Sequence, residues 1–331
     1  MVSKGTQTLI FAVVLTLATS SQGIFTTASK VDGKYLYNFA TVPLLAEAVK
    51  LTVSFYFLLR LKWCGETVKM TRNWKTWALF PVPSIIYVIH NNVQFYMLKY
   101  VNPSTYQILG NLKIITTGLL FRLLLGRRLT VLQWIALVLL MVGATTSQVQ
   151  TDCGGAEATF SAPLEGYLFG LFSAFLSALA AVYTEWVMKK NDDCLYWQNI
   201  QLYTFGVIFN AVKLTLDDIN VSFSNGLWVD KVFVNYNTAT YFVVANLAFS
   251  GLLVSWIMKF ADSIVKVYST SMAMLVTMLF SVWLFHLRPS LQLVLGIFCA
   301  SSSLQLYYMR PSDLAISSSK GHQSGILPTR A

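Results

Sequence analysis

The sequence predicts an all-α polytopic membrane protein whose ten transmembrane helices form two inverted five-helix repeats. Three observations predict this fold. Hydrophobic residues make up 55% of the 331 residues and charged residues only 11%, whereas a soluble domain carries about 25% charged residues. Apolar runs of about 20 residues, the length that crosses a bilayer core, recur along the chain. Short segments of the first half also recur in the second half.

The apolar runs divide the chain, in order, into spans, one linker and one tail. The first repeat, 1–150, contains runs at 7–28, 36–59, 77–98, 103–125 and 131–149. The polar segment 151–163 is expected to be a luminal linker. The second repeat, 164–308, contains runs at 164–188, 196–216, 238–258, 263–285 and 290–308. Residues 309–331 are expected to form a mobile cytosolic tail.

The internal similarity predicts how the two halves are related. The segment AVKLT at 48–52 recurs at 211–215, and LTVLQ at 129–133 resembles PSLQ at 289–292 with a nearly constant offset. Five spans in each half place the halves in opposite orientations across the membrane. Secondary transporters use such inverted repeats, with the substrate site at the repeat interface near the bilayer midplane.

The basic residues predict the orientation. With a cytosolic N-terminus, sixteen of the 24 Lys and Arg residues fall on the cytosolic side and six on the other side. Because cytoplasmic loops of membrane proteins are enriched in Lys and Arg, both termini are expected to face the cytosol. The net charge of +10 has the same explanation, and a nucleic-acid partner is not expected.

Ionisable side chains inside predicted spans are costly and therefore indicate function. Glu47 and Lys50 are three residues apart on one helix face and can form a pair, which would also let the helix insert as a purely structural element. Lys113 has no acidic partner in its own span. We expect it in a water-filled cavity where it can bind an anion; the alternative is a pair with Glu47 across helices.

Further polar groups fall near the middle or the ends of spans. Asn91 and Asn92 lie mid-span, and such amides either bind a ligand or hold helices together. Lys266 lies just inside a predicted span end, where a lysine can also snorkel to the interface. Glu185 lies near a span end and is expected to be solvated. A stripe of small residues is expected to pack within the bundle or at a homodimer face: Gly166, Gly170, Ala174 and Ala178.

Together these residues predict a binding cavity rather than a catalytic site. Lysines, amides and tyrosines around one cavity suit an anionic ligand such as a nucleotide. The chain has no GxxxxGK[ST] phosphate loop and no catalytic set, and its histidines and cysteines lack metal-ligand spacing. We therefore expect neither an enzyme nor a cofactor nor a metal.

The motifs resemble those of the nucleotide-sugar transporters, and most closely the group that carries CMP-sialic acid. The resemblance covers about 36–308 and is carried by Asn91-Asn92 with 93–97, by Tyr106-Gln107, by Leu112-Lys113-Ile114, by RRLTVLQW at 127–134, by NIQLY at 199–203 and by KFADSIVK at 259–266. It implies ten spans and a Golgi membrane protein. It also implies exchange of cytosolic CMP-sialic acid, or a related CMP-sugar, for luminal CMP by alternating access.

The resemblance also implies roles for individual residues. Glu47, Lys50 and Asn91 would meet the nucleobase. The phosphate would be held by Tyr106, Asn92, Lys113, Tyr203 and Lys266. Asn199 and Ser255 would lie nearer the ribose or the sugar.

Two departures from the family pattern leave the sugar open. Gly110-Asn111 stand where the family commonly has Tyr-Gln, and Phe205 stands where it has Ser. A UDP-galactose or other UDP-sugar antiporter, which would exchange for UMP, is therefore the alternative. A proton-coupled cation exporter needs a membrane carboxylate without a lysine partner, and a non-transporting scaffold needs no buried lysine; Glu47 and Lys113 argue against these two classes.

Overall fold

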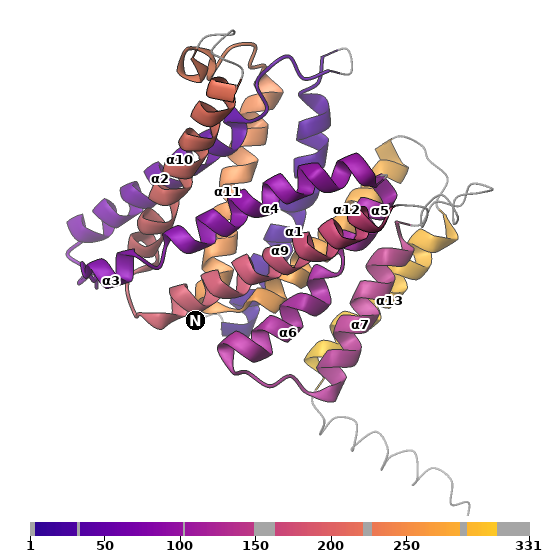
Figure 1. The fold of residues 1–331 in the computed structure, drawn as a ribbon. Helices are drawn as coiled ribbons and strands as arrows, with labels where there is room; N and C mark the ends of the chain where they lie inside the picture. Colours follow the sequence, from indigo (N-terminus) through magenta and orange to yellow (C-terminus); the bar gives the residue numbers. More distant parts are fainter. Residues whose placement is uncertain are drawn as a thin grey trace, which may run out of the picture.

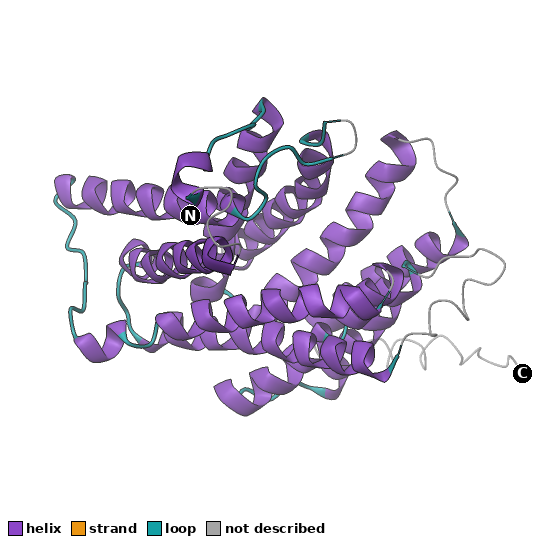
Figure 2. Ribbon diagram, turned by 45° about the horizontal axis from the view of Figure 1, so that its top comes forward, coloured by secondary structure: helices purple, strands orange, loops and turns teal. Residues whose placement is uncertain are grey.

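The protein is a bundle of helices in the computed structural model, which describes residues 4–31, 34–101, 103–148, 163–220, 227–284 and 290–309. Figures 1 and 2 show the helices of this single chain packed side by side. In chain order they are α1 (Lys4–Ala28), α2 (Thr41–Trp63), α3 (Trp74–Trp77), α4 (Pro81–Tyr100), α5 (Pro103–Gly110), α6 (Lys113–Leu125), α7 (Val131–Thr146), α9 (Leu164–Lys190), α10 (Leu195–Asn220), the 3-10 turn η1 (Trp228–Lys231), α11 (Thr238–Phe260), α12 (Ser263–Leu284) and α13 (Leu291–Tyr308).

Seven helical stretches among the described residues are long and apolar enough to cross a membrane. They are Gly5–Ala28, Thr41–Trp63, Thr105–Leu125, Leu164–Lys190, Thr238–Phe260, Ser263–Phe280 and Leu291–Tyr308. The prediction of an all-α polytopic membrane protein is thereby confirmed. The other three predicted spans fall on α4, α7 and α10. Of these, α7 is apolar but only 16 residues long, and α4 and α10 carry polar side chains such as His90 and Asn199.

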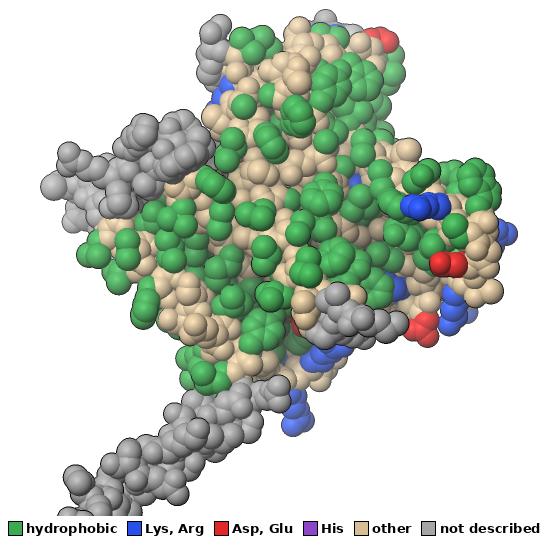
Figure 3. All heavy atoms as spheres, turned by 180° about the vertical axis from the view of Figure 1, so that it is seen from behind, with side chains coloured by type: hydrophobic (Ala, Val, Ile, Leu, Met, Phe, Trp, Pro, Cys, Tyr) green, Lys and Arg blue, Asp and Glu red, His purple; other side chains and the backbone are tan. Residues whose placement is uncertain are grey.

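The surface agrees with a membrane protein. Apolar side chains spread across the middle of the face in Figure 3, whereas the charged side chains lie towards the margins. Large apolar residues such as Leu123, Val131 and Phe298 are at least 70% exposed. In water such a surface would favour aggregation, whereas in a bilayer it faces lipid tails.

Several helix pairings join the two halves of the chain. Helix α2 packs along α10, α4 along α9, and α7 along α13, while α1 lies against both α11 and α12. Helix α6 also packs against α9. The two halves of the chain are thus interleaved rather than separate, and any cavity at the centre of the bundle receives side chains from both.

The small-residue stripe on α9 is buried inside the chain. A Cβ atom at Gly166 would lie 2.6 Å from Val101, and one at Gly170 would lie 2.6 Å from Leu109. Ala174 and Ala178 are also buried. Of the two expectations for this stripe, packing within the bundle is confirmed.

Helices α7 and α13 cross at two glycines. A Cβ atom at Gly296 would lie 2.7 Å from the carbonyl oxygen of Gly143 and 2.8 Å from the Cβ of Ser147. Backbone lies on one side of this contact, so a methyl group has no flexible neighbour to displace. The two helix backbones approach closely because neither residue has a side chain.

The Gly296→Ala protein is expected to be less stable than the wild type by about 1–3 kcal/mol, the usual cost of overpacking. The measurement is the thermal unfolding midpoint in detergent. Gly23→Ala is the matched control, because its added Cβ would meet only Thr277 at an ordinary 3.9 Å. Equal midpoints for the Gly296→Ala and Gly23→Ala proteins would contradict the tight crossing.

Candidate functional site

A central cavity of about 470 Å³ lies between helices of both halves. Its walls come from α1, α2, α4, α9, α10, α11 and α12. Five of the residues predicted from the sequence line it: Glu47, Lys50, Tyr203, Ser255 and Lys266. The volume falls in the range of cavities that bind small molecules.

Glu47 and Lys50 form an ion pair at one wall of the central cavity. The Lys50 Nζ lies 2.5 Å from a Glu47 carboxylate oxygen, and it lies 4.4 Å from the centroid of the Tyr203 ring. Lys50 is only 8% exposed. The carboxylate and the aromatic face compensate its desolvated charge. This arrangement fits the structural alternative, and the role in ligand binding stays a prediction.

Two glycines make room for this ion pair. A Cβ at Gly206 on α10 would lie 2.6 Å from Glu47 Oε2, and a Cβ at Gly251 on α11 would lie 2.6 Å from Lys50 Cδ. The Gly251 carbonyl also accepts a hydrogen bond of 3.2 Å from the Tyr203 hydroxyl. Sequence reasoning missed both glycines, although a glycine inside a helical pattern is the available signal for a close approach.

Lys266 lies on α12, in the other half of the chain from Lys50, and the described residues give it no carboxylate partner. Within the part of the chain that the structure describes, no carboxylate oxygen lies within 4.0 Å of its Nζ. Its Nζ donates to the Tyr87 hydroxyl over 3.3 Å. Tyr87, which also lines the central cavity, was not predicted from the sequence because one tyrosine in an apolar helix gives no distinctive pattern.

Lys113 lies at a break in its span. Helix α5 ends at Gly110, a turn covers 111–112, and Lys113 is the first residue of α6. A cation at a helix N-terminus faces the positive end of the helix dipole. The described residues also place no carboxylate within 4.0 Å of its Nζ. The alternative of a Lys113–Glu47 pair is therefore not what the structure shows, since Glu47 pairs with Lys50.

Lys113 and Tyr106 line a second, side cavity of about 350 Å³. Its other walls carry amides and hydroxyls, contributed by Gln94, Gln107, Asn111, Gln148, Ser173 and Thr277. The amide nitrogen of Asn111 is buried and has no hydrogen-bond partner among the described residues. An uncompensated cation beside an unused amide donor is an arrangement that suits an anion.

The central and side cavities are electrostatically connected. Lys113 and Lys266 repel each other, and His90 experiences the positive charge of both. His90 itself is buried, with its Nδ1 at 3.3 Å from the Ser173 hydroxyl. Two like charges held near each other without acidic partners lower the free energy of an incoming anion.

One predicted residue, Asn199, lies apart from these cavity walls. Asn199 is buried on α10, its side-chain oxygen has no hydrogen-bond partner in the described chain, and it lines neither cavity. Asn91 and Asn92 belong to α4, but their side chains lie outside the described residues. Their predicted roles therefore stay predictions.

Glu185 is the clearest correction to the sequence-based expectations. It is fully buried, not solvated. Its carboxylate accepts hydrogen bonds from the Lys189 Nζ at 2.7 Å and from the Ser263 backbone amide at 2.6 Å. It thus joins the end of α9 to the start of α12, the helix that carries Lys266.

Comparisons with known proteins identify the class. Residues 5–308 match the family described as nucleotide-sugar transporter. The chain is 57% identical over 305 residues to CMP-sialic acid transporter 1 of Oryza sativa subsp. japonica, covering 92% of this chain and 94% of that protein. It is 56% identical over 307 residues to CMP-sialic acid transporter 1 of Arabidopsis thaliana, covering 92% and 90%.

More distant matches agree. CMP-sialic acid transporter 2 of Oryza sativa subsp. indica is 38% identical over 303 residues, which cover 90% of this chain and 83% of that protein. One crystal structure of a protein superposes with a TM-score of 0.66 at 14% identity, over 92% of this chain and 98% of that chain, and this likeness concerns the fold alone. The chain belongs to the nucleotide-sugar transporter family, and it is a multi-pass membrane transporter rather than an enzyme.

Proposed function

We propose that this protein is a Golgi antiporter that exchanges cytosolic CMP-sialic acid, or a related CMP-sugar, for luminal CMP. The observation that carries the proposal is the pair of lysines, Lys113 and Lys266, that repel each other and have no carboxylate within 4.0 Å among the described residues. The negative charge of a nucleotide would compensate their positive charge. The names of the relatives favour cytidine as the base and sialic acid as the sugar.

The proposed roles of the side chains are those that the family resemblance implies. Lys113, Lys266, Tyr106, Tyr203 and Asn92 hold the phosphate. Glu47, Lys50 and Asn91 meet the base; a carboxylate beside an ammonium offers both a hydrogen-bond acceptor and donors to the edge of a cytosine. Ser255 and Asn199 lie nearer the ribose or the sugar.

Alternating access by two inverted repeats is the proposed mechanism, with ten spans in all. The helix pairing supports it. Taken in chain order, the counterparts in the two proposed repeats are α1 and α9, α2 and α10, α4 and α11, α6 and α12, and α7 and α13. Replacing each helix by its counterpart turns the α1·α11 contact into α9·α4 and the α1·α12 contact into α9·α6. All four of these contacts are present. The pairs α2·α10 and α7·α13 exchange with themselves. A fixed site between such repeats can open to either side.

Exchange rather than one-way transport follows from the charge. Without ligand, the central cavity holds Lys266 and the side cavity holds Lys113, neither with a carboxylate partner among the described residues. Carrying these two charges through the closed, dehydrated intermediate is costly. Bound CMP or a CMP-sugar removes that cost in either direction. Both termini are proposed to face the cytosol, which matches the excess of basic residues on that side.

The test is thermal stabilisation by nucleotides, followed by exchange in proteoliposomes. CMP at 100 times its dissociation constant is expected to stabilise the protein by about 2.7 kcal/mol, and UMP, AMP and GMP at equal concentration to stabilise it less. Vesicles preloaded with CMP are expected to accumulate labelled CMP-sialic acid, and empty vesicles are not. Stabilisation by UMP alone would instead support the UDP-sugar alternative, and no response to any nucleotide would contradict the proposal.

A further inference from the structure

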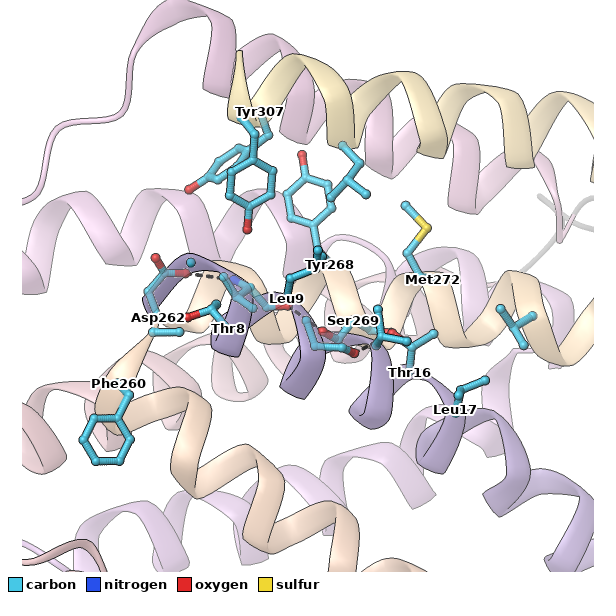
Figure 4. Close-up of a pocket in the computed structure, with 18 residues that line it drawn as sticks. Thr8, Leu9, Thr16, Leu17, Phe260, Asp262, Tyr268, Ser269, Met272 and Tyr307 are labelled. Carbon is cyan, nitrogen blue, oxygen red and sulfur yellow. Dashed lines mark hydrogen bonds between the residues drawn. The ribbon is translucent and has the colours of Figure 1, made fainter. Parts of the chain in front are cut away.

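A lateral groove of about 850 Å³ lies on the outside of the bundle between α1, the start of α12 and the end of α13. Figure 4 shows Leu9, Thr16 and Leu17 of α1 along one side of it and Met272 of α12 facing them. The groove shares no lining residue with the central cavity. It therefore needs an explanation other than nucleotide binding.

The walls of this lateral groove face the hydrocarbon. Leu9, Val13 and Leu17 are 50–60% exposed, and the three helices are all among the stretches long and apolar enough to cross a membrane. An exposed apolar side chain on such a helix meets lipid tails rather than water. The largely apolar lining of this slot suits an acyl chain.

One end of the lateral groove is chemically different. Asp262 lies there, at the connection between α11 and α12, with Tyr307 on the same side (Figure 4). Tyr307 and Tyr308 line the same groove as Asp262. Their ring centroids are 5.3 Å apart, and the Tyr268 ring lies 5.2 Å from that of Tyr307. The end of the groove therefore combines three aromatic rings with one carboxylate.

The Asp262 carboxylate has no basic partner within 4.0 Å in the described parts of the chain. One oxygen accepts a hydrogen bond of 2.8 Å from the Val265 backbone amide, which caps α12. Lys189, whose Nζ donates to the neighbouring carbonyl of Ala261, is paired with Glu185 instead. Among the described side chains, the carboxylate is thus without a cationic partner, and its negative charge can attract a cation outside the protein.

We infer that the lateral groove binds a phosphatidylcholine molecule. An acyl chain lies along α1, and the choline group sits at Asp262 against Tyr307 and Tyr308. Aromatic faces with a nearby carboxylate are the usual recognition site for quaternary ammonium groups. An anionic headgroup would meet the Asp262 charge and is disfavoured. The inference is independent of the nucleotide specificity.

Native mass spectrometry of the full-length chain tests this lipid site. The protein, purified in dodecyl maltoside, is mixed with equal amounts of phosphatidylcholine and phosphatidylglycerol carrying identical acyl chains. The wild type is expected to retain one phosphatidylcholine. Asp262→Asn is expected to lower this retention about tenfold and to leave phosphatidylglycerol retention unchanged or higher. Asparagine keeps an oxygen for the Val265 amide, so the helix cap persists.

Two further variants make the outcome decisive. Asp192→Asn is the matched control, since its side chain is 92% exposed and only approaches Lys69 at 3.6 Å; its phosphatidylcholine retention is expected to equal that of the wild type. Tyr308→Leu keeps apolar surface and removes one ring, and should also lose phosphatidylcholine selectively. Equal phosphatidylcholine retention by wild type and Tyr308→Leu, or wild-type retention of phosphatidylglycerol as strong as that of phosphatidylcholine, would overturn the inference, even if Asp262→Asn fails to fold.

Discussion

A Lys113→Ala protein is expected to lose CMP binding and exchange while remaining folded. A hydrogen bond to a charged group contributes about 1.5–3 kcal/mol, so the affinity for CMP should fall about 10- to 100-fold. The unliganded protein should be no less stable than the wild type, because the substitution removes the repulsion between Lys113 and Lys266. Thermal unfolding with and without CMP, together with CMP-sialic acid uptake by CMP-loaded vesicles, measures both effects.

Two controls separate this effect from a general loss of charge. Lys75→Ala removes an exposed lysine and should leave CMP stabilisation unchanged. Lys113→Arg retains the positive charge and should keep part of the binding. If Lys113→Ala bound CMP with wild-type affinity, the assignment of the phosphate to this lysine would be wrong.

Glu47→Gln is expected to destabilise the protein by about 3–5 kcal/mol, the usual cost of leaving one member of a buried ion pair uncompensated. The affected charge is that of Lys50, which is 8% exposed and lies 2.5 Å from the carboxylate that is removed. The thermal unfolding midpoint in detergent, without nucleotide, is the measurement.

A double variant separates stability from ligand recognition at this pair. Glu47→Gln combined with Lys50→Met removes both charges, and should recover most of the lost stability because no charge is left unpaired. It should not recover transport, since the groups proposed to meet the base are gone. A double variant that transports at the wild-type rate would show that the pair is only structural.

The membrane fold could be predicted from composition and apolar runs because bilayer crossing imposes a length and a hydropathy that any sequence must display. Element ends were less predictable. The second span was expected to start at residue 36, but α2 begins at Thr41, after Asn38, whose side chain accepts a hydrogen bond from the Ala40 amide. The interruption before Lys113 was also missed, because Gly110 and Asn111 interrupt an otherwise apolar run without a charge or a proline.

The candidate site could be predicted only as a set of residue types. Lysines in spans are rare enough to be noticed individually, and the structure places Lys50 and Lys266 in one cavity and Lys113 in the next. Which groups compensate them depends on tertiary contacts. Lys50 faces Tyr203 from a helix that is distant in sequence, and Glu185, expected in solvent, is buried against the amide of Ser263. Neither contact leaves a local sequence pattern.

The clearances at Gly206 and Gly251 have a consequence for sequence variation. The Glu47 side chain packs against Gly206, and the Lys50 side chain packs against Gly251. An added methyl group at either glycine would contact that side chain rather than backbone. The four positions are therefore coupled in size as well as in charge. Across relatives, a larger residue at either glycine should co-occur with a shorter side chain at its partner, whereas chains that keep Glu47 and Lys50 together should keep both glycines. Covariation of these four positions in an alignment of relatives would thus indicate that the ion pair packs against the two glycines, without a structure of each relative.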